Sequence, residues 1–198
     1  MYQKYQTDAL VLSSRELGEA DKMYALFTRD FGLVRARASA VRREASRMRY
    51  ALQNYALVHV SLVRGKRGWR IAGARSEGAA LGLGAFARAA ELVTRLVPGE
   101  EKNDYLYESL LGAHQALMQG CGGPTSRGGR TSAISTIEIV CVARVLYALG
   151  YISAEALQTA LFTHADFQSD DIREAESLRP KLLASINHAL AETQLITR

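Results

Sequence analysis

Short runs of alternating apolar and polar residues fill the first part of the chain. An alternation with a period of two places successive side chains on opposite faces of a β-strand, so the runs predict strands over residues 5–14, 22–27, 33–38, 56–63 and 69–74. Glycine-containing turns separate them, at Asp30-Phe31-Gly32 and at Arg64-Gly65-Lys66-Arg67-Gly68. Five short strands in about 75 residues predict a small barrel, and the OB-fold is the five-stranded barrel that most often meets oligonucleotides.

The pattern changes to helical spacing after residue 78. Apolar residues recur every three or four positions over 85–97, 103–118, 136–149, 154–162 and 175–196, which predicts helices. Asn103 or Asp104 can cap the second helix, and Pro180 suits a first helical turn. We therefore expect an α+β protein, with an OB-fold nucleic-acid-binding domain over 1–78 and an all-helical domain over 79–198. A glycine-rich stretch at about 120–130 predicts a flexible loop.

Charge is divided unevenly between the two parts. Residues 1–78 hold 15 Lys and Arg against 7 Asp and Glu, a net charge of +8, whereas residues 79–198 carry −3. Arg35 and Arg37 share one face of a predicted strand, and the loop after it adds Arg42, Arg43, Arg47 and Arg49. Such a one-signed cluster favours a polyanion partner, because Lys and Arg neutralise phosphates and release counterions.

Aromatic rings lie among these cations and can offer stacking surfaces to nucleobases. Tyr24, Tyr50, Tyr55 and Trp69 are the rings concerned, and core packing is the competing interpretation for each. The candidate nucleic-acid contacts are Lys22, Arg35, Arg37, Arg42, Arg43, Arg47, Arg49, Arg64, Lys66, Arg67, Tyr24 and Trp69.

Motifs for catalysis or for a metal are lacking in the sequence. It contains no Walker loop, nucleophile elbow, HExxH motif or dinucleotide fingerprint, and its two cysteines, Cys121 and Cys141, form no CxxC pair. We therefore expect no enzyme activity, no cofactor and no metal site. His59 is interpreted as an ordinary strand residue. Arg144 lies in the most apolar predicted helix, where it either reaches a carboxylate or offers a partner's terminal carboxylate a guanidinium.

Several short motifs of the first part resemble the RecO family of bacterial recombination mediators. The matching residues are Glu19-x-Asp21, Leu26-Phe27-Thr28-Arg29-x-x-Gly32, Ala38, Arg42-Arg43, Ser46-Arg47, Leu52-Gln53-x-Tyr55 and Arg64-Gly65-x-x-Gly68. The resemblance covers residues 5 to 78. It implies an N-terminal OB-fold followed by a helical domain.

The resemblance also implies a function. Members of this family bind single- and double-stranded DNA, anneal complementary strands and help to load the recombinase in the RecF pathway, with RecR and the C-terminal tail of the single-strand-binding protein as partners. The chain departs from the family at Ser39-Ala40, where a Lys-Gly pair is usual, and it lacks the four-cysteine zinc site that many members carry.

Two other functions fit the same charge pattern. An RNA-binding OB-fold protein of the translation or RNA-chaperone class would also need a basic barrel, and so would a scaffold that binds an acidic protein. No signal-peptide layout and no apolar run of about 20 residues is present. We therefore expect a cytoplasmic, nucleoid-associated protein without a membrane partner.

Overall fold

The computed structural model describes residues 3–77, 84–122 and 127–193. The chain divides into two compact units, Met1–Tyr107 and Glu108–Arg198. The boundary expected between residues 78 and 79 lies within a segment outside the described residues. It stays a prediction about the domain organisation.

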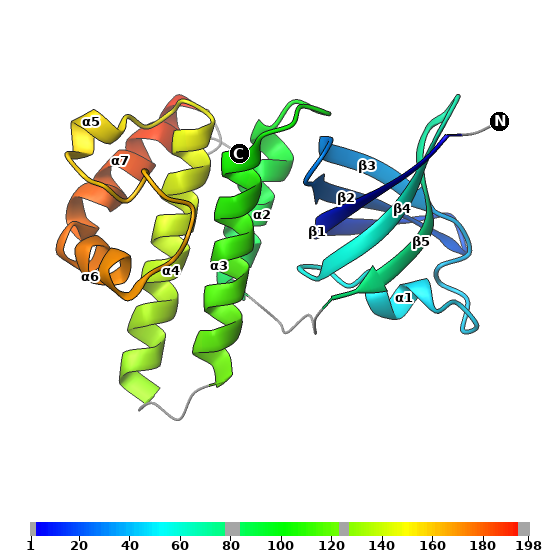
Figure 1. The fold of residues 1–198 in the computed structure, drawn as a ribbon, viewed down its shortest axis with the longest axis horizontal. Helices are drawn as coiled ribbons and strands as arrows, with labels where there is room; N and C mark the ends of the chain where they lie inside the picture. The colour runs from blue at the N-terminus through cyan, green and yellow to red at the C-terminus, as the bar shows by residue number, and fades with distance from the viewer. Residues whose placement is uncertain (1–2, 78–83, 123–126, 194–198) are drawn as a thin grey trace. The chain divides into compact units, whose positions relative to one another are not determined.

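Five strands of the first unit form a closed barrel (Figure 1). They are β1 (Lys4–Leu17), β2 (Asp21–Thr28), β3 (Gly32–Ala38), β4 (Leu57–Gly65) and β5 (Gly68–Ser76), in the spatial order β1-β2-β3-β5-β4. All neighbours are antiparallel except β3 and β5, which pair in parallel at Ala36–Trp69 and Arg37–Arg70 and so close the barrel. A one-turn helix, α1 (Met48–Ala51), follows β3. The expected five-stranded OB-fold barrel is confirmed.

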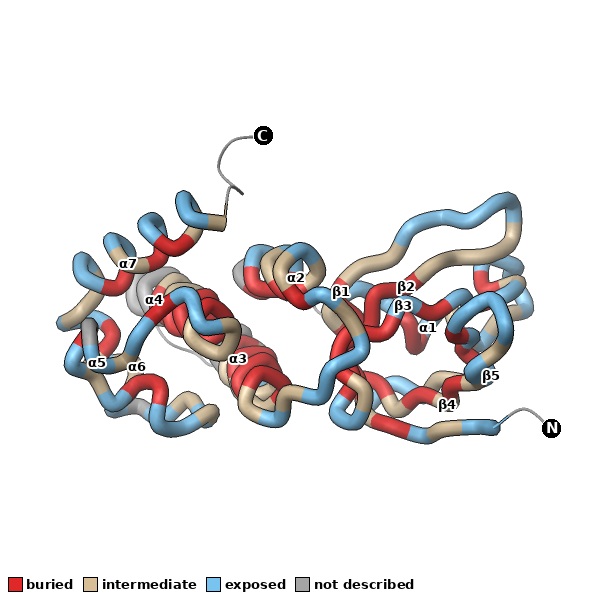
Figure 2. Tube along the Cα trace, turned by 90° about the horizontal axis from the view of Figure 1, so that it is seen from above, coloured by how far each residue is buried: buried red, intermediate tan, exposed pale blue. Residues whose placement is uncertain are grey.

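Alternation along the strands places one side of each in the barrel core. Val58, Val60 and Leu62 of β4 are fully buried, as the sequence pattern predicts. The pattern predicts one buried face for β2, but Tyr24 to Thr28 are all buried there (Figure 2). Phe27 points away from the barrel core and stacks on Tyr107 with a centroid distance of 6.4 Å, which covers the second face.

The β2–β3 turn needs glycine at Gly32. Its φ is +64°, and a Cβ there would lie 2.0 Å from the Glu101 carbonyl oxygen. The Thr28 hydroxyl donates to the Gly32 carbonyl, and the Phe31 amide donates to the same hydroxyl, both over 3.0 Å. This turn therefore seats the hairpin against the segment that connects α2 with α3.

Helix α2 (Gly84–Leu96) belongs to the first unit and packs on β1 through an apolar stripe. Phe86, Ala89 and Val93 of that stripe are buried, and Phe86 meets Tyr55 edge to face. Helix α3 (Asp104–Gly122) begins in this unit, and the Asn103 side chain caps it by accepting from the Leu106 amide over 2.9 Å.

The second unit contains the rest of α3 with α4 (Arg127–Ala148), α5 (Ala154–Leu157), α6 (Ser169–Ser177) and α7 (Arg179–Glu192). Helix α4, buried at most positions over residues 136–146, packs on α6 and α7. These helices confirm the α+β class. No helix among the described residues is both long and apolar enough to span a membrane.

Several helix boundaries differ from the predicted ones. Helix α4 begins at Arg127 instead of near residue 136, although it includes Gly128 and Gly129, which are poor helix formers. Helix α3 ends at Gly122, so residues 120–122 and 127–130 of the expected loop are helical, and residues 123–126 lie outside the described residues. The helix predicted over 154–162 is a single turn, and the last predicted helix is interrupted at Leu178, where Pro180 begins α7 as expected.

Candidate nucleic-acid interface

The outer face of β3 carries two arginines because of strict alternation. Val34, Ala36 and Ala38 point into the core and are fully buried, while Arg35 and Arg37 are exposed. The parallel pairing of β3 with β5 then places Arg70 directly beside Arg37. Barrel closure therefore brings the cations of the β4–β5 turn to the β3 arginines.

A groove of about 630 Å³ runs along this face. We call it the β3 groove, and its cations are Arg35, Arg37, Lys66, Arg67 and Arg70. Four of them are among the sequence-predicted contacts. Arg70 is not, although its alternation with the buried Trp69 and Ile71 places it outside the barrel. The β2–β3 face and the loop between strands 4 and 5 are also where OB-folds bind oligonucleotides.

The cations of the β3 groove differ in how far protein groups neutralise them. Arg37 forms an ion pair with Asp21, with its Nε 2.7 Å from Oδ2. Arg35 donates to the Thr94 carbonyl of α2 over 3.4 Å. Within the described part of the chain, Lys66, Arg67 and Arg70 have no carboxylate within 4.0 Å. Three cations are thus available to an external anion.

The Asp21 carboxylate is held in its charged form. Its pKa is lowered first by the hydrogen bond from the Ala40 amide to Oδ1, at 2.7 Å, and then by its bond to Arg37. Ala40 has a φ of +55°, a left-handed conformation that favours glycine. The position where the RecO family usually has glycine therefore keeps a glycine-like backbone in this chain.

A second groove, of about 560 Å³, lies beside α1. We call it the α1 groove, and it is lined by Lys22, Arg42, Arg49, Tyr50, Gln53 and Asn54, with five further residues. Arg42 pairs with Glu16 at 3.1 Å. The Tyr50 side chain is 63% exposed, and the Arg49 guanidinium lies 4.7 Å from its ring centroid. Three predicted cations are therefore gathered around an exposed ring.

The two aromatic residues predicted to contact nucleic acid are buried in the barrel. Tyr24 is 1% exposed and Trp69 is 5% exposed. Trp69 packs against Tyr5 and Phe31 with centroid distances of 5.4 Å to each, and Arg64 lies over its ring. Burial also raises the pKa of the Tyr24 hydroxyl. Neither ring presents a face to a nucleobase in this structure, because barrel closure turns both positions inward.

The remaining predicted cations lie outside both grooves. Arg43 and Arg47 are exposed on the loop between β3 and α1, and Arg64 forms an ion pair with Glu100 at 3.3 Å. Seven predicted cations therefore line the two grooves. The β3 groove has Arg35, Arg37, Lys66 and Arg67, and the α1 groove has Lys22, Arg42 and Arg49.

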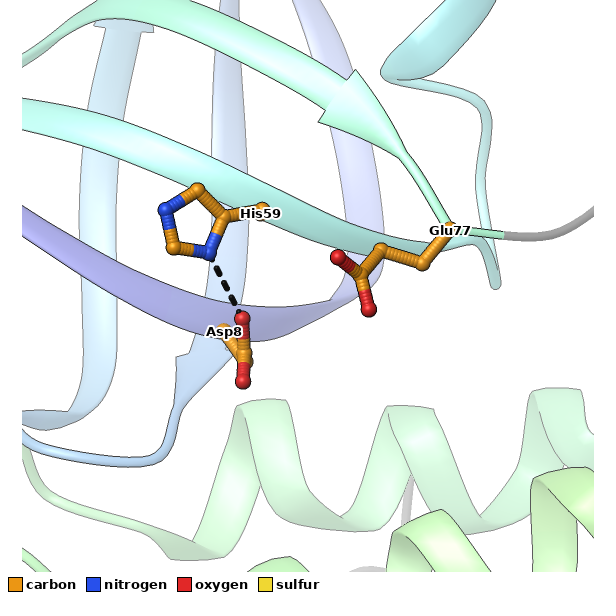
Figure 3. Close-up of side chains that lie close together, drawn as sticks. All are labelled: Asp8, His59 and Glu77. Carbon is orange, nitrogen blue, oxygen red and sulfur yellow. Dashed lines mark hydrogen bonds and ion pairs between the residues drawn. The ribbon is translucent and has the colours of Figure 1, made fainter.

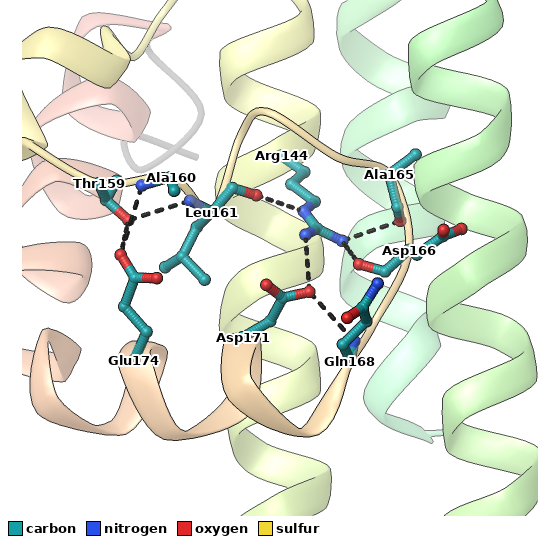
Figure 4. Close-up of polar contacts among 9 residues, drawn as sticks. All are labelled: Arg144, Thr159, Ala160, Leu161, Ala165, Asp166, Gln168, Asp171 and Glu174. Carbon is teal, nitrogen blue, oxygen red and sulfur yellow. Dashed lines mark hydrogen bonds and ion pairs between the residues drawn. The ribbon is translucent and has the colours of Figure 1, made fainter.

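Arg144 of α4 is fully buried and serves the interior of the second unit (Figure 4). Its guanidinium donates to the carbonyls of Leu161, Ala165 and Asp166, each over 2.8 Å, and lies 3.6 Å from an Asp171 oxygen. The Phe167 ring covers it at 4.5 Å. The predicted pocket for a partner's carboxylate is thus not open in this structure, because residues 161–171 fold over Arg144.

One cluster of described residues could hold a metal ion (Figure 3). Asp8 of β1 and His59 of β4 are register partners, and the Asp8 Oδ1 lies 2.7 Å from His59 Nδ1. Glu77 follows β5, and one donor atom from each of the three residues lies within 4.8 Å of the others. The imidazole with two carboxylates is a donor set that Zn²⁺ accepts. The sequence does not indicate this cluster, because only the β1–β4 register brings Asp8 to His59.

Comparison with known proteins agrees with this geometry. Residues 1–73 match the family model described as "Recombination protein O N terminal". A protein of Desulfitobacterium hafniense named "DNA repair protein RecO" is 42% identical over 62 residues, which cover 31% of this chain and 23% of that protein. One of the same name from Pelotomaculum thermopropionicum is 32% identical over 125 residues, which cover 59% of this chain and 48% of that protein. The chain therefore spans about half or less of the curated relatives it matches, and its residues 1–73 are similar to the N-terminal domain of the RecO family.

Proposed function

We propose that this protein acts in DNA repair and recombination and that its barrel binds the backbone of single- and double-stranded DNA in the β3 groove. The observation that carries the proposal is the gathering of Arg35, Arg37, Lys66, Arg67 and Arg70 in one groove. For Lys66, Arg67 and Arg70, no carboxylate of the described residues lies within 4.0 Å. Relatives named as DNA repair proteins support DNA as the polyanion.

Backbone neutralisation is the source of affinity in such a groove. Each phosphate that meets a Lys or Arg releases condensed counterions, so the logarithm of the binding constant falls with the logarithm of salt concentration. With five cations engaged, the expected slope for single-stranded DNA is about −3.5. Binding would be nearly independent of sequence, since the phosphates carry no sequence information.

Annealing of complementary strands extends the same proposal. Two DNA strands repel each other through their phosphates, and a basic surface that binds both lowers that repulsion. Help in recombinase loading, together with RecR and the tail of the single-strand-binding protein as partners, is proposed on the resemblance to the RecO family alone. No surface of the described residues is assigned to either protein.

The test is fluorescence anisotropy of a labelled single-stranded oligonucleotide over a salt series. The variant Lys66→Ala/Arg67→Ala/Arg70→Ala removes three exposed cations without breaking any ion pair of the described structure. We expect the magnitude of the salt slope to decrease by about 2 and the affinity for the oligonucleotide to decrease as well. A matched variant, Lys102→Ala/Arg173→Ala/Lys181→Ala, removes the same charge outside both grooves and should bind almost as the unchanged protein does.

Other outcomes of the anisotropy experiment would contradict parts of the proposal. Equal losses in the two variants would show that net charge rather than the β3 groove carries binding. Absence of binding at low salt would overturn the proposal in favour of a protein scaffold. Competition with RNA of the same sequence decides between DNA and RNA, and a clear preference for RNA would favour the RNA-binding alternative.

A further inference from the structure

The α1 groove is a surface separate from the β3 groove. The two sets of lining residues have no member in common. Lys22 and Tyr24 of β2 line the α1 groove, whereas Met23 between them lines the β3 groove. Since successive side chains of a strand point to opposite faces, the hairpin separates the two grooves.

The walls of the α1 groove are anchored in the core. Val41 and Leu52 flank the segment that carries Arg42 and Arg49, and they are 1% and 3% exposed. The Arg42 amide donates to the Ala20 carbonyl over 3.0 Å, and its guanidinium donates to the Gly18 carbonyl over 3.1 Å. The loop between β3 and α1 is thus fastened to the β1–β2 turn, which fixes the opening of the groove.

Tyr50 gives this groove a chemistry that the β3 groove lacks. Its ring is exposed, whereas the Trp69 ring at the β3 groove is buried. The Arg49 Nη2 donates to the Tyr50 hydroxyl over 2.7 Å while its guanidinium lies over the ring, so the ring is held in place with a cation beside it. Proteins that bind single strands without sequence preference stack the bases on aromatic rings that lie next to cations.

We propose that the α1 groove is a second binding site for single-stranded DNA, in which a nucleobase stacks on Tyr50 and Lys22, Arg42 and Arg49 meet the phosphates. This inference rests on the proposed function and adds a second strand to it. The exposed amides of Gln53 and Asn54 line the same groove and can hydrogen-bond base edges. A double helix would not offer its base faces to Tyr50, so this site selects unpaired strands.

The two grooves divide the work of annealing between them. One strand lies along the backbone-binding β3 groove, and the other is held at the α1 groove with bases unstacked from their neighbours. Both strands are then bound to one small barrel, which raises their local concentration and lowers their repulsion. Loss of the α1 groove should therefore reduce annealing more than it reduces binding of one strand.

The experiment counts bound strands. Native mass spectrometry with an oligothymidylate of about five nucleotides, near the lower limit of an OB-fold site, should show two per chain. Tyr50→Ala should leave one, with a loss of roughly 5- to 150-fold in affinity for the second strand. Tyr50→Trp should keep both, and Tyr151→Ala, which removes another exposed tyrosine, should change nothing. An abasic oligonucleotide should bind the unchanged protein and Tyr50→Ala alike at the second site.

Failure of this inference is distinguishable from failure of the proposed function. The unchanged protein could bind only one strand, and this strand could be lost in Lys66→Ala/Arg67→Ala/Arg70→Ala but retained in Tyr50→Ala. This result would support DNA binding in the β3 groove and overturn the second site. Two strands whose binding does not depend on Tyr50 would overturn base stacking. No bound strand at low salt would reject both.

Discussion

Arg37 of β3 and Asp21 of β2 form an ion pair across the hairpin, with the arginine Nε donating to Oδ2 over 2.7 Å. The other oxygen of the same carboxylate accepts from the Ala40 amide. One acid therefore positions a cation of the β3 groove and holds the left-handed residue Ala40 at the start of the loop between β3 and α1.

Asp21→Asn tests the charge of that carboxylate through pH. The folded pKa of Asp21 lies below its ordinary value of 3.8, so its ionisation stabilises the fold above that pH and the contribution is lost as pH falls through the folded pKa. We expect Asp21→Asn to lower the free energy of unfolding at neutral pH. The difference should shrink as the pH is lowered below the ordinary pKa, in urea titrations at a series of pH values.

Glu44→Gln is the matched control for this pH series. Glu44 is exposed, and no ion pair involves it in the described structure. The free energy of unfolding of Glu44→Gln should not differ from that of the unchanged protein by an amount that grows with pH. A constant difference for Asp21→Asn at all pH values would contradict an electrostatic role for the acid.

Ala40→Gly should stabilise the protein. An L-residue in the left-handed region costs about 1–2 kcal/mol, while glycine adds about 0.4–1 kcal/mol of unfolded-state entropy, so a net gain of about 0.5–1 kcal/mol is expected in chemical denaturation. Ala45→Gly in the same loop lacks a positive φ and should be neutral or destabilising. A loss of stability in Ala40→Gly would show that the backbone is not strained there.

Much of this architecture follows from sequence pattern. Alternation locates the strands and places Arg35 and Arg37 outward, because only one face of β3 is buried over residues 34–38. It does not reveal that Tyr24 and Trp69 point inward while Tyr50 stays exposed. That outcome depends on the phase of the alternation relative to barrel closure, and for Tyr50 on a helical turn of four residues.

The pattern of apolar and polar residues does not predict contacts between residues that are far apart in the sequence. The Asp8–His59 pair depends on the β1–β4 register, and the role of Arg144 depends on the path of residues 161–171. Helical periodicity shows that Arg144 lies in an apolar helix. It carries no information about the carbonyls that meet it.

Arg144→Met should destabilise the second unit by about 3 kcal/mol or more, because three carbonyls and the Asp171 carboxylate lose their donor inside the protein. The thiol of Cys141 offers a local measurement, since burial raises its pKa to about 12 and keeps it unreactive in the folded unit. In a Cys121→Ser background, alkylation of Cys141 should become much faster in Arg144→Met.

The control for Arg144 is an arginine with an exposed partner. Arg173 pairs with Asp170 at 3.8 Å, and both side chains are more than four-fifths exposed. Arg173→Met should change stability by no more than about 0.5 kcal/mol and should leave the alkylation rate unchanged. Equal effects in the two variants would contradict the structural role of Arg144.

Zn²⁺ should bind at Asp8, His59 and Glu77 and raise the Tm. Donors around a tetrahedral zinc lie about 3.3 Å apart, given bonds of about 2.0 Å, so small side-chain rotations close the observed spread of 4.8 Å. The ion must displace Arg75, which lies 3.5 Å from Glu77. Ligands from β1, β4 and the end of β5 would then be tied together, so binding to the folded state alone stabilises the barrel by mass action.

Thermal unfolding with and without Zn²⁺, reversed by a chelator, measures the shift in Tm. His59→Ala should abolish it, while His188→Ala, which removes an exposed histidine 3.6 Å from Glu192, should retain it. A shift of equal size in both variants would mean that zinc binds elsewhere on the chain.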